Sequence, residues 1–348
     1  MFGFFLAQSL ALAATPSPEP SVLTAPVPDA AQFGDWSVAY DNIRYCEILA
    51  ADGDISALTL YVSRMALGTA QLKVKVQRSF GGGTPAAAYI KIDGRRSDFA
   101  VDIEGNLIGS PPAFLAALAK ANSAQAIGRG GEILGAIPVT GASAALGWMD
   151  DRQGRADTVT AIVAKGASPA NSVPPPPLLP KVVMPDMSNA PPQQLSAQNV
   201  RDIRAISEYC DDDREIFETY RLDAEHTVGI VLCFLAAYQG LSIIVVIDDA
   251  GNWELASIER AFRSGKDESG ASWQYMLTTA DFNSDSRLLT SISKGRGAAD
   301  CGSSASWAWD GKVFRLTSLK MLEPCRGAPP ELWLSRWQTA NDPLDRSQ

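Results

Sequence analysis

The side chains that could carry out chemistry are few in this sequence of 348 residues. Five cysteines are spread along the chain, at Cys46, Cys210, Cys233, Cys301 and Cys325. None of them forms the close C-x-x-C spacing of a zinc or redox site. Isolated cysteines instead indicate disulfides, which persist in oxidising compartments. The cysteines therefore predict an exported protein.

A single histidine, His226, is the one imidazole that could serve in acid–base or metal chemistry. It lies in a polar segment between two predicted strands, and no serine or cysteine nucleophile motif points to it. We interpret it as a solvated turn residue. A single histidine excludes metal sites built on several histidines, and no motif in the sequence fixes a reaction. We therefore predict no catalytic, metal-binding or cofactor-binding residue and no cofactor.

Two acidic clusters could supply the paired carboxylates that glycoside hydrolysis needs across a cleft. They are residues 211–213 and Asp248-Asp249. Both fall in predicted turns, which favours solvated side chains over a catalytic pair. A non-catalytic binding or envelope-associated protein is therefore the first hypothesis. A hydrolase acting on cell-wall glycan is the alternative, and an inhibitor of a wall-degrading enzyme is a third.

Tryptophans concentrate in the C-terminal part of the chain, where six of the eight are found. On a β-surface, tryptophans can stack on sugars or peptides. The candidate binding surface comprises Trp307, Trp309, Trp333 and Trp337. Core packing is the alternative for each of them, because a small β-domain needs large aromatic side chains to fill it. The expected partner is cell-wall glycan or an envelope protein.

The N-terminal residues resemble an export signal. Residues 2–14 form an apolar run that ends in Ala11-Leu12-Ala13, a small-x-small pattern suited to signal peptidase. The run is too short to span a bilayer. The opening positive charge of a usual signal is absent, because the first basic residue is Arg44. We expect residues 1–14 to be a signal peptide and the protein to be periplasmic or secreted. The alternative is a buried N-terminal helix, which the prolines that follow the run disfavour.

Charge and proline content set the partners and the domain organisation. With 30 basic and 39 acidic side chains, the net charge of −9 repels phosphate backbones, so nucleic acid is excluded as a partner. No transmembrane segment is expected. Residues 15–32 and 166–194 are proline-rich, and we expect extended linkers there. They delimit two β-rich domains, residues 33–165 and 195–348, and 46% hydrophobic content suffices to give each a core.

The hydrophobic periodicity predicts a mainly β, α+β protein. In the first domain we expect two helices, at 111–118 and 140–152, and strands at 58–62, 72–76, 89–92, 98–103 and 158–163. The second domain opens with a helix over 196–207, capped by Ser196. Eight strands follow, at 215–222, 227–237, 241–247, 253–261, 273–282, 287–293, 304–309 and 312–318. This antiparallel meander predicts a sandwich or a barrel.

The sharpest turn signal is Asp310-Gly311 between alternating segments. As a two-residue loop it places Trp307 opposite Phe314. The same register brings Cys301 opposite Lys320 and close to Cys325, which predicts a disulfide between the two cysteines. A second pair, Cys210 with Cys233, flanks another predicted hairpin. Cys46 is left over.

Several stretches resemble a bacterial family known as domain-of-unknown-function family 1176, whose members are periplasmic proteins of two domains. The matching segments are 33–38, 141–146, 151–155, 294–297, 300–302, 307–311 and 325–327. The first domain is also similar to the invasion-associated locus B protein, a secreted β-rich module. Neither resemblance implies a catalytic residue, substrate or cofactor.

One departure from the family pattern concerns Cys46. Family members read Cys-Asp-Asn where this chain has Tyr40-Asp41-Asn42. The small N-terminal disulfide that the resemblance implies cannot form here, which predicts a free or intermolecular thiol at Cys46.

Overall fold

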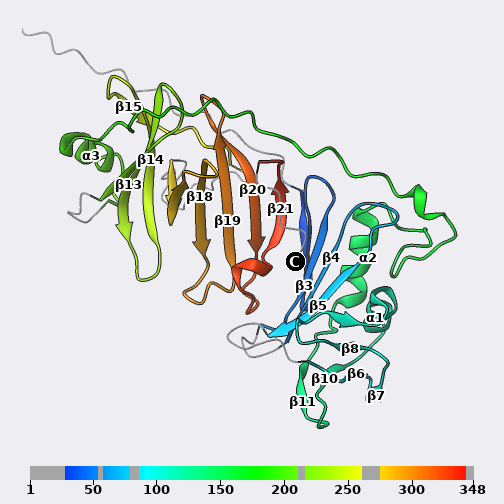
Figure 1. Cartoon of the computed structure of the whole chain (residues 1–348). Helices are drawn as coiled ribbons and strands as arrows, with labels where there is room; N and C mark the ends of the chain where they lie inside the picture. Colours follow the sequence, from blue (N-terminus) through cyan, green and yellow to red (C-terminus); the bar gives the residue numbers. More distant parts are fainter. Residues whose placement is uncertain (1–27, 54–57, 79–85, 211–215, 261–274, 342–348) are drawn as a thin grey trace, which may run out of the picture.

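The computed structural model describes residues 28–53, 58–78, 86–210, 216–260 and 275–341. Within these ranges antiparallel strands dominate and three α-helices accompany them (Figure 1), so the mainly β, α+β class is confirmed. We refer to residues 28–165 as the N-terminal half and to residues 195–341 as the C-terminal half. None of the helices among the described residues has the length and apolar character needed to cross a membrane.

The N-terminal half is centred on a five-stranded sheet whose strands follow one another in chain order. They are β1 (Ala30–Phe33), β2 (Trp36–Tyr40), β3 (Cys46–Ala50), β4 (Leu58–Arg64) and β5 (Lys73–Arg78). Two helices, α1 (Pro111–Leu118) and α2 (Ala142–Arg152), add side chains to the core on one face of this sheet. A smaller sheet contains β6 (Tyr89–Ile92), β7 (Arg95–Arg96), β10 (Ala124–Ile127) and β11 (Ile133–Ala136), and β8 (Ala100–Val101) pairs with β9 (Leu107–Ile108).

One predicted strand of this half is wrong. Residues 158–163 form turns, with a single bridge between Thr158 and Ser168. The reason lies in Asp150, a fully buried residue of α2. Its carboxylate accepts hydrogen bonds from the backbone N–H groups of Ile162 (2.8 Å) and Val163 (2.9 Å), which therefore do not join a sheet.

The C-terminal half is a sandwich of two five-stranded antiparallel sheets, neither of which closes into a barrel among the described residues. The first contains β12 (Phe217–Arg221), β13 (His226–Leu235), β14 (Gly240–Asp248), β15 (Trp253–Leu255) and β16 (Met276–Thr278). The second contains β17 (Ala280–Asn283), β18 (Leu288–Lys294), β19 (Gly302–Trp309), β20 (Phe314–Leu322) and β21 (Leu334–Gln338). Both sheets contribute to one core, for example Val228 and Ile244 from the first and Leu289 and Phe314 from the second. The preceding helix α3 (Ala197–Arg204) is capped by Ser196, which accepts from the backbone N–H of Asn199.

The register of the β19–β20 hairpin differs from the prediction. Trp309 faces Phe314, and Trp307 faces Leu316. The loop therefore spans four residues, 310–313, because the Asp310 carboxylate accepts from the backbone N–H groups of Lys312 (2.9 Å) and Val313 (2.8 Å). Such a side-chain turn competes with the tighter hairpin. Lys320 accordingly pairs with Ser304 rather than with Cys301.

The two halves are joined where β21 packs on β2 and β3. Leu49 of the N-terminal sheet shares a buried cluster with Leu322, Trp333 and Leu334 of the C-terminal half. This sheet therefore has buried side chains on both faces, one toward the helices and one toward the sandwich. The sequence pattern did not predict β2 and β3, because burial on both faces removes the alternation of buried and exposed positions.

Polar side chains are buried at the same junction. The Asp41 carboxylate accepts from the hydroxyl of Ser335 (3.3 Å) and from the Gln338 amide. The Glu47 carboxylate accepts from the Tyr61 hydroxyl and from the backbone N–H of Ser335. Burial raises the pKa of Glu47. We call Asp41, Glu47, Tyr61, Ser335 and Gln338 the junction network.

The linker at residues 166–194 follows the N-terminal half and runs extended along the molecule (Figure 1). It forms hydrogen bonds with both halves. Pro174 accepts a hydrogen bond from Arg44 (2.9 Å). Further along, Val182 exchanges hydrogen bonds with the side chain of Asn341 (2.7 and 2.8 Å), and Pro185 accepts from Arg287 (2.7 Å). The linker is therefore a strap along the surface rather than a spacer that separates two bodies.

We expect Trp333→Ala to lower the free energy of unfolding by about 3–5 kcal/mol, because it empties a site at the centre of the junction where the side chain is 1% exposed. Urea denaturation followed by circular dichroism measures this loss. Trp253→Ala is the matched control, since Trp253 is only half-buried and lies away from the junction. Equal losses in the two variants would contradict the junction's role.

Candidate functional site

Three of the four candidate surface tryptophans are buried, so the exposed aromatic surface predicted for them is wrong. Trp307, Trp309 and Trp333 are 4%, 3% and 1% exposed. Their indole N–H groups bond inside the protein: that of Trp307 to the carbonyl of Glu259 (2.7 Å) and that of Trp309 to the Asp223 carboxylate (2.7 Å). These side chains fill the sandwich core and the junction.

Trp337 differs from the other three, because it is half-buried and lines an open groove of about 470 Å³. One wall is the strap at Lys181 and Val182. The other contains Glu259, Asp310 and Arg315 of the sandwich. We call this the Trp337 groove. The Trp337 indole N–H donates to the carbonyl of Leu316 (3.1 Å), which fixes the orientation of the ring.

The charged groups on the sandwich wall of the Trp337 groove are paired with one another. Arg315 Nε lies 2.7 Å from Asp310 Oδ2, and Arg315 Nη1 lies 3.6 Å from Glu259 Oε1. Burial opposes ionisation of Asp310, but hydrogen bonds from Arg315 and from the backbone N–H groups of Val313 and Lys312 outweigh it and lower the pKa of the carboxyl. Asp310 therefore stays ionised and is a poor proton donor. The groove offers oriented acceptors and donors beside an aromatic ring, which is chemistry for binding.

His226 is not the freely solvated turn residue predicted from the sequence. It is the first residue of β13, and its Nδ1 lies 2.9 Å from Asp223 Oδ1. Its ring packs against Trp309 with centroids 5.4 Å apart. Asp223 also accepts from the Trp309 indole and from the backbone N–H of Glu225. The carboxylate thus organises the turn, and the imidazole belongs to that arrangement.

Asp248 and Asp249, which are the described residues among those considered for hydrolysis, do not form a facing pair. Asp248 accepts from the backbone and side-chain nitrogens of Asn252, both at 2.8 Å. Asp249 pairs with Arg221 at 2.8 Å. Asp248 therefore stabilises its own turn, and Asp249 connects that turn to Arg221 of β12. The other acidic cluster, residues 211–213, lies outside the described residues.

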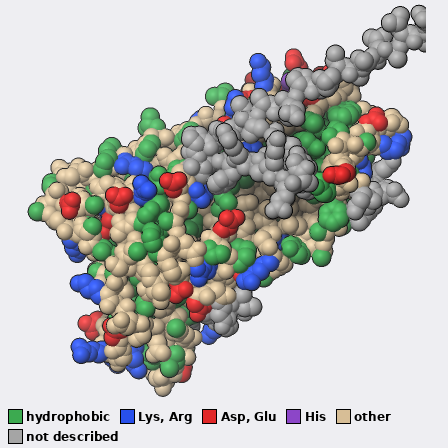
Figure 2. Space-filling view, turned by 180° about the vertical axis from the view of Figure 1, so that it is seen from behind, with side chains coloured by type: hydrophobic (Ala, Val, Ile, Leu, Met, Phe, Trp, Pro, Cys, Tyr) green, Lys and Arg blue, Asp and Glu red, His purple; other side chains and the backbone are tan. Residues whose placement is uncertain are grey.

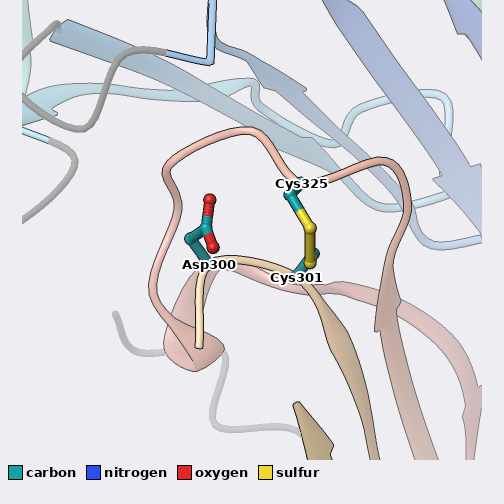
Figure 3. Close-up of side chains that lie close together, drawn as sticks. All are labelled: Asp300, Cys301 and Cys325. Carbon is teal, nitrogen blue, oxygen red and sulfur yellow. A yellow bond between two sulfur atoms is a disulfide. The ribbon is translucent and has the colours of Figure 1, made fainter. Parts of the chain in front are cut away.

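Two disulfides are present, Cys210–Cys233 and Cys301–Cys325. The second lies beside Asp300 (Figure 3), and the possible ligand atoms of Asp300, Cys301 and Cys325 are within 4.8 Å of one another. The disulfide between Cys301 and Cys325 occupies both of their sulfur atoms.

The Asp300 carboxylate is likewise engaged in the structure. It is fully buried and accepts from Arg296 (2.5 Å) and from the backbone N–H of Gly327 (3.0 Å). The hydrogen bond from Arg296, only partly opposed by burial, lowers the pKa of Asp300. The hydrogen bond from Gly327 to Asp300 and the neighbouring disulfide connect the β18–β19 loop to the segment after β20, so the cluster has a structural role.

Cys46 is buried and free of any disulfide. Burial raises the pKa of its thiol well above the ordinary value, which keeps it protonated and unreactive. Tyr40 lies directly opposite it in the β2–β3 register. A cysteine at position 40 would therefore face Cys46 across the hairpin.

Charge on the visible surface is mixed. On the face shown in Figure 2, basic and acidic side chains of the described residues are interspersed rather than gathered by sign. Such a face lacks the basic tract that a nucleic-acid partner requires.

The sequence profile of the family described as "Protein of unknown function (DUF1176)" matches residues 30–340. The chain belongs to this family. It is also 27% identical over 349 residues to the "Uncharacterized protein YpfG" of Escherichia coli (strain K12), covering 91% of this chain and 96% of that protein. No solved structure matches. The likeness of the first domain to the invasion-associated locus B protein stays a hypothesis from the sequence.

We expect Tyr40→Cys to form a disulfide with Cys46, as the DUF1176 pattern implies. Thiol titration under denaturing conditions should fall from one free thiol per chain to none. In the chain-entropy picture, closing so short a loop raises the free energy of unfolding by about 2 kcal/mol. The lost packing of Tyr40 against Trp148 reduces this gain. Tyr40→Ser is the control, because it loses the ring without adding a thiol. Two reactive thiols in oxidised Tyr40→Cys would contradict the expected pairing.

Proposed function

We propose that this DUF1176 protein is an exported, non-catalytic binding protein of the bacterial cell envelope, and that it binds cell-wall glycan in the Trp337 groove. In this proposal, residues 1–14 are the export signal, and a proline-rich linker at 15–32 leads to the first β-rich domain, 33–165. The linker at 166–194 connects that domain to the second, 195–348. The half-buried Trp337 beside oriented charged groups is the observation that carries the binding role.

Export is supported by the redox state of the cysteines. Four of the five form disulfides, and such bonds persist in the periplasm or outside the cell. The fifth is buried, which protects it from oxidation and exchange. The apolar run at residues 2–14 supplies a segment that an export pathway can recognise.

Glycan binding is supported by the composition of the Trp337 groove. Sugars present an apolar ring face and a rim of hydroxyls, so their sites combine an aromatic platform with fixed hydrogen-bonding groups. Trp337 supplies the platform, and its bond to Leu316 holds it in place. Asp310, Glu259 and Arg315 supply acceptors and donors whose positions their mutual pairing fixes.

The same groups argue against hydrolysis as the function of this groove. A glycosidase needs one carboxyl with a raised pKa to protonate the leaving group. Here Asp310 has a lowered pKa, and Arg315 contacts both carboxylates. The groove is therefore suited to binding a glycan without cleaving it.

A fusion of residues 1–40 to alkaline phosphatase, which is active only after export, tests the compartment. We expect activity in intact cells, because the apolar run should direct the reporter to the oxidising periplasm. A matched fusion that begins at residue 15 should be inactive. Equal activity from both fusions, or none from either, would remove the export proposal.

Trp337→Ala tests the binding role. We expect the wild-type chain to bind soluble peptidoglycan fragments from a muramidase digest, and the variant to bind them at least about tenfold more weakly, since a lost aromatic anchor costs about 1.4 kcal/mol or more. Isothermal titration calorimetry measures both affinities. Trp253→Ala, another half-buried tryptophan, should bind like the wild type. No binding by the wild type, or equal binding by Trp337→Ala, would refute the site.

A further inference from the structure

A second groove lies on the other side of β21 and is independent of the Trp337 groove. It has a volume of about 380 Å³ and runs along β1 between the N-terminal sheet and the end of β20. Ala30, Ser37 and Ala39 contribute small side chains, and Leu334 and Arg336 of β21 line it as well. We call it the β1 groove. Small side chains along one wall leave room for a ligand to approach the strand backbone.

The outer edge of β1 is open among the described residues, where β1 pairs with β2 alone. Phe33 and Trp36 flank the two-residue turn of the β1–β2 hairpin and face each other. The pair beside such a turn is hydrogen-bonded, and bonded and non-bonded pairs alternate along an antiparallel ladder. The backbone N–H and C=O groups of Gln32 and Ala30 therefore point away from β2. They present the hydrogen-bonding pattern that an added strand would complete.

Ser37 provides a second, independent observation. Its side chain lines the β1 groove, the residue is 3% exposed, and its Oγ has no hydrogen-bond partner in the described structure. A buried hydroxyl without a partner costs free energy and is uncommon. A ligand that enters the groove and bonds to this hydroxyl would remove that cost.

The charges at one end of the groove specify the ligand further. Asp29 and Glu323 line it and are exposed, whereas Arg336 is the one basic residue among the described residues of the lining. The Arg336 guanidinium is buried and donates to the carbonyl of Pro28. The accessible charge at this end is therefore negative, and a basic side chain complements it.

We infer that the β1 groove binds an extended peptide segment of a partner protein, which adds as a strand to the free edge of β1. One polar side chain of the peptide reaches across β1 into the groove to bond to the Ser37 hydroxyl, and a Lys or Arg lies beside Asp29 and Glu323. The strand edge accounts for main-chain affinity, and the acidic end accounts for selectivity. An extended peptide fits all three observations, because a glycan would not use the regular spacing of the β1 backbone groups.

The probe is a phage-displayed library of random 12-residue peptides, panned on the full chain, with the enriched peptides synthesised and titrated by fluorescence anisotropy. We expect enriched peptides to share a basic position. Gln32→Pro, which removes an outward N–H from an edge strand that tolerates proline, should weaken their binding at least tenfold. Glu323→Lys should weaken it at least fivefold. Glu225→Lys, an equal charge change at an exposed site on the sandwich, should leave it unchanged.

Ser37→Ala keeps the test decisive if Gln32→Pro fails to fold. Because the hydroxyl has no partner in the free protein, we expect an unchanged or higher melting temperature together with an affinity lowered about threefold or more. A purely structural hydroxyl would lower the melting temperature instead. Failure to enrich basic peptides, equal binding by Gln32→Pro, or a dimer of this chain that Gln32→Pro dissociates would each overturn the inference.

Discussion

The fold depends on the burial of both faces of the N-terminal sheet. One face packs against α1 and α2, and the other packs against β21 of the sandwich. A sheet face that carries carboxylates can be buried only if they are satisfied inside the protein. The junction network does this, because Asp41 and Glu47 accept hydrogen bonds from Ser335 and Gln338 of β21. A shift of β21 by one residue would remove the donors that this strand supplies to Asp41 and Glu47, so the network favours one way for the two halves to meet.

The position of β21 also determines where ligands can bind. It is the edge strand of its own sheet and packs on the face of another. Leu334 and Arg336 line the β1 groove, and Trp337 and Thr339 line the Trp337 groove. Two proposed binding surfaces therefore share one strand, whose placement the junction network controls. The strap completes the Trp337 groove from outside, which gives the proline-rich linker a role in shaping a surface.

Much of the fold could be predicted from local patterns, and the junction could not. Alternating residues predicted most strands of the sandwich, and Ser196 predicted the start of α3. The β19–β20 register was wrong because one carboxylate, Asp310, holds a four-residue loop. The strands β2 and β3 lack alternation since both of their faces are buried. The bond from Ser335 to Glu47 joins residues 288 positions apart, and no local pattern carries such information. Burial of tryptophans likewise depends on contacts that are distant in the sequence. The sequence therefore predicted a surface of four tryptophans, of which only Trp337 is partly exposed.

Hydrogen–deuterium exchange of the intact chain tests most directly whether the junction makes one unit of the two halves. The amide of Ser335 bonds to buried Glu47, and β21 packs on β2 and β3. We predict that peptides covering β21 and β3 exchange at the same slow rate, and that Glu47→Gln raises both rates together. If β21 exchanges rapidly while β3 stays protected, or if Glu47→Gln changes one and not the other, the two halves are held independently and the claim is contradicted.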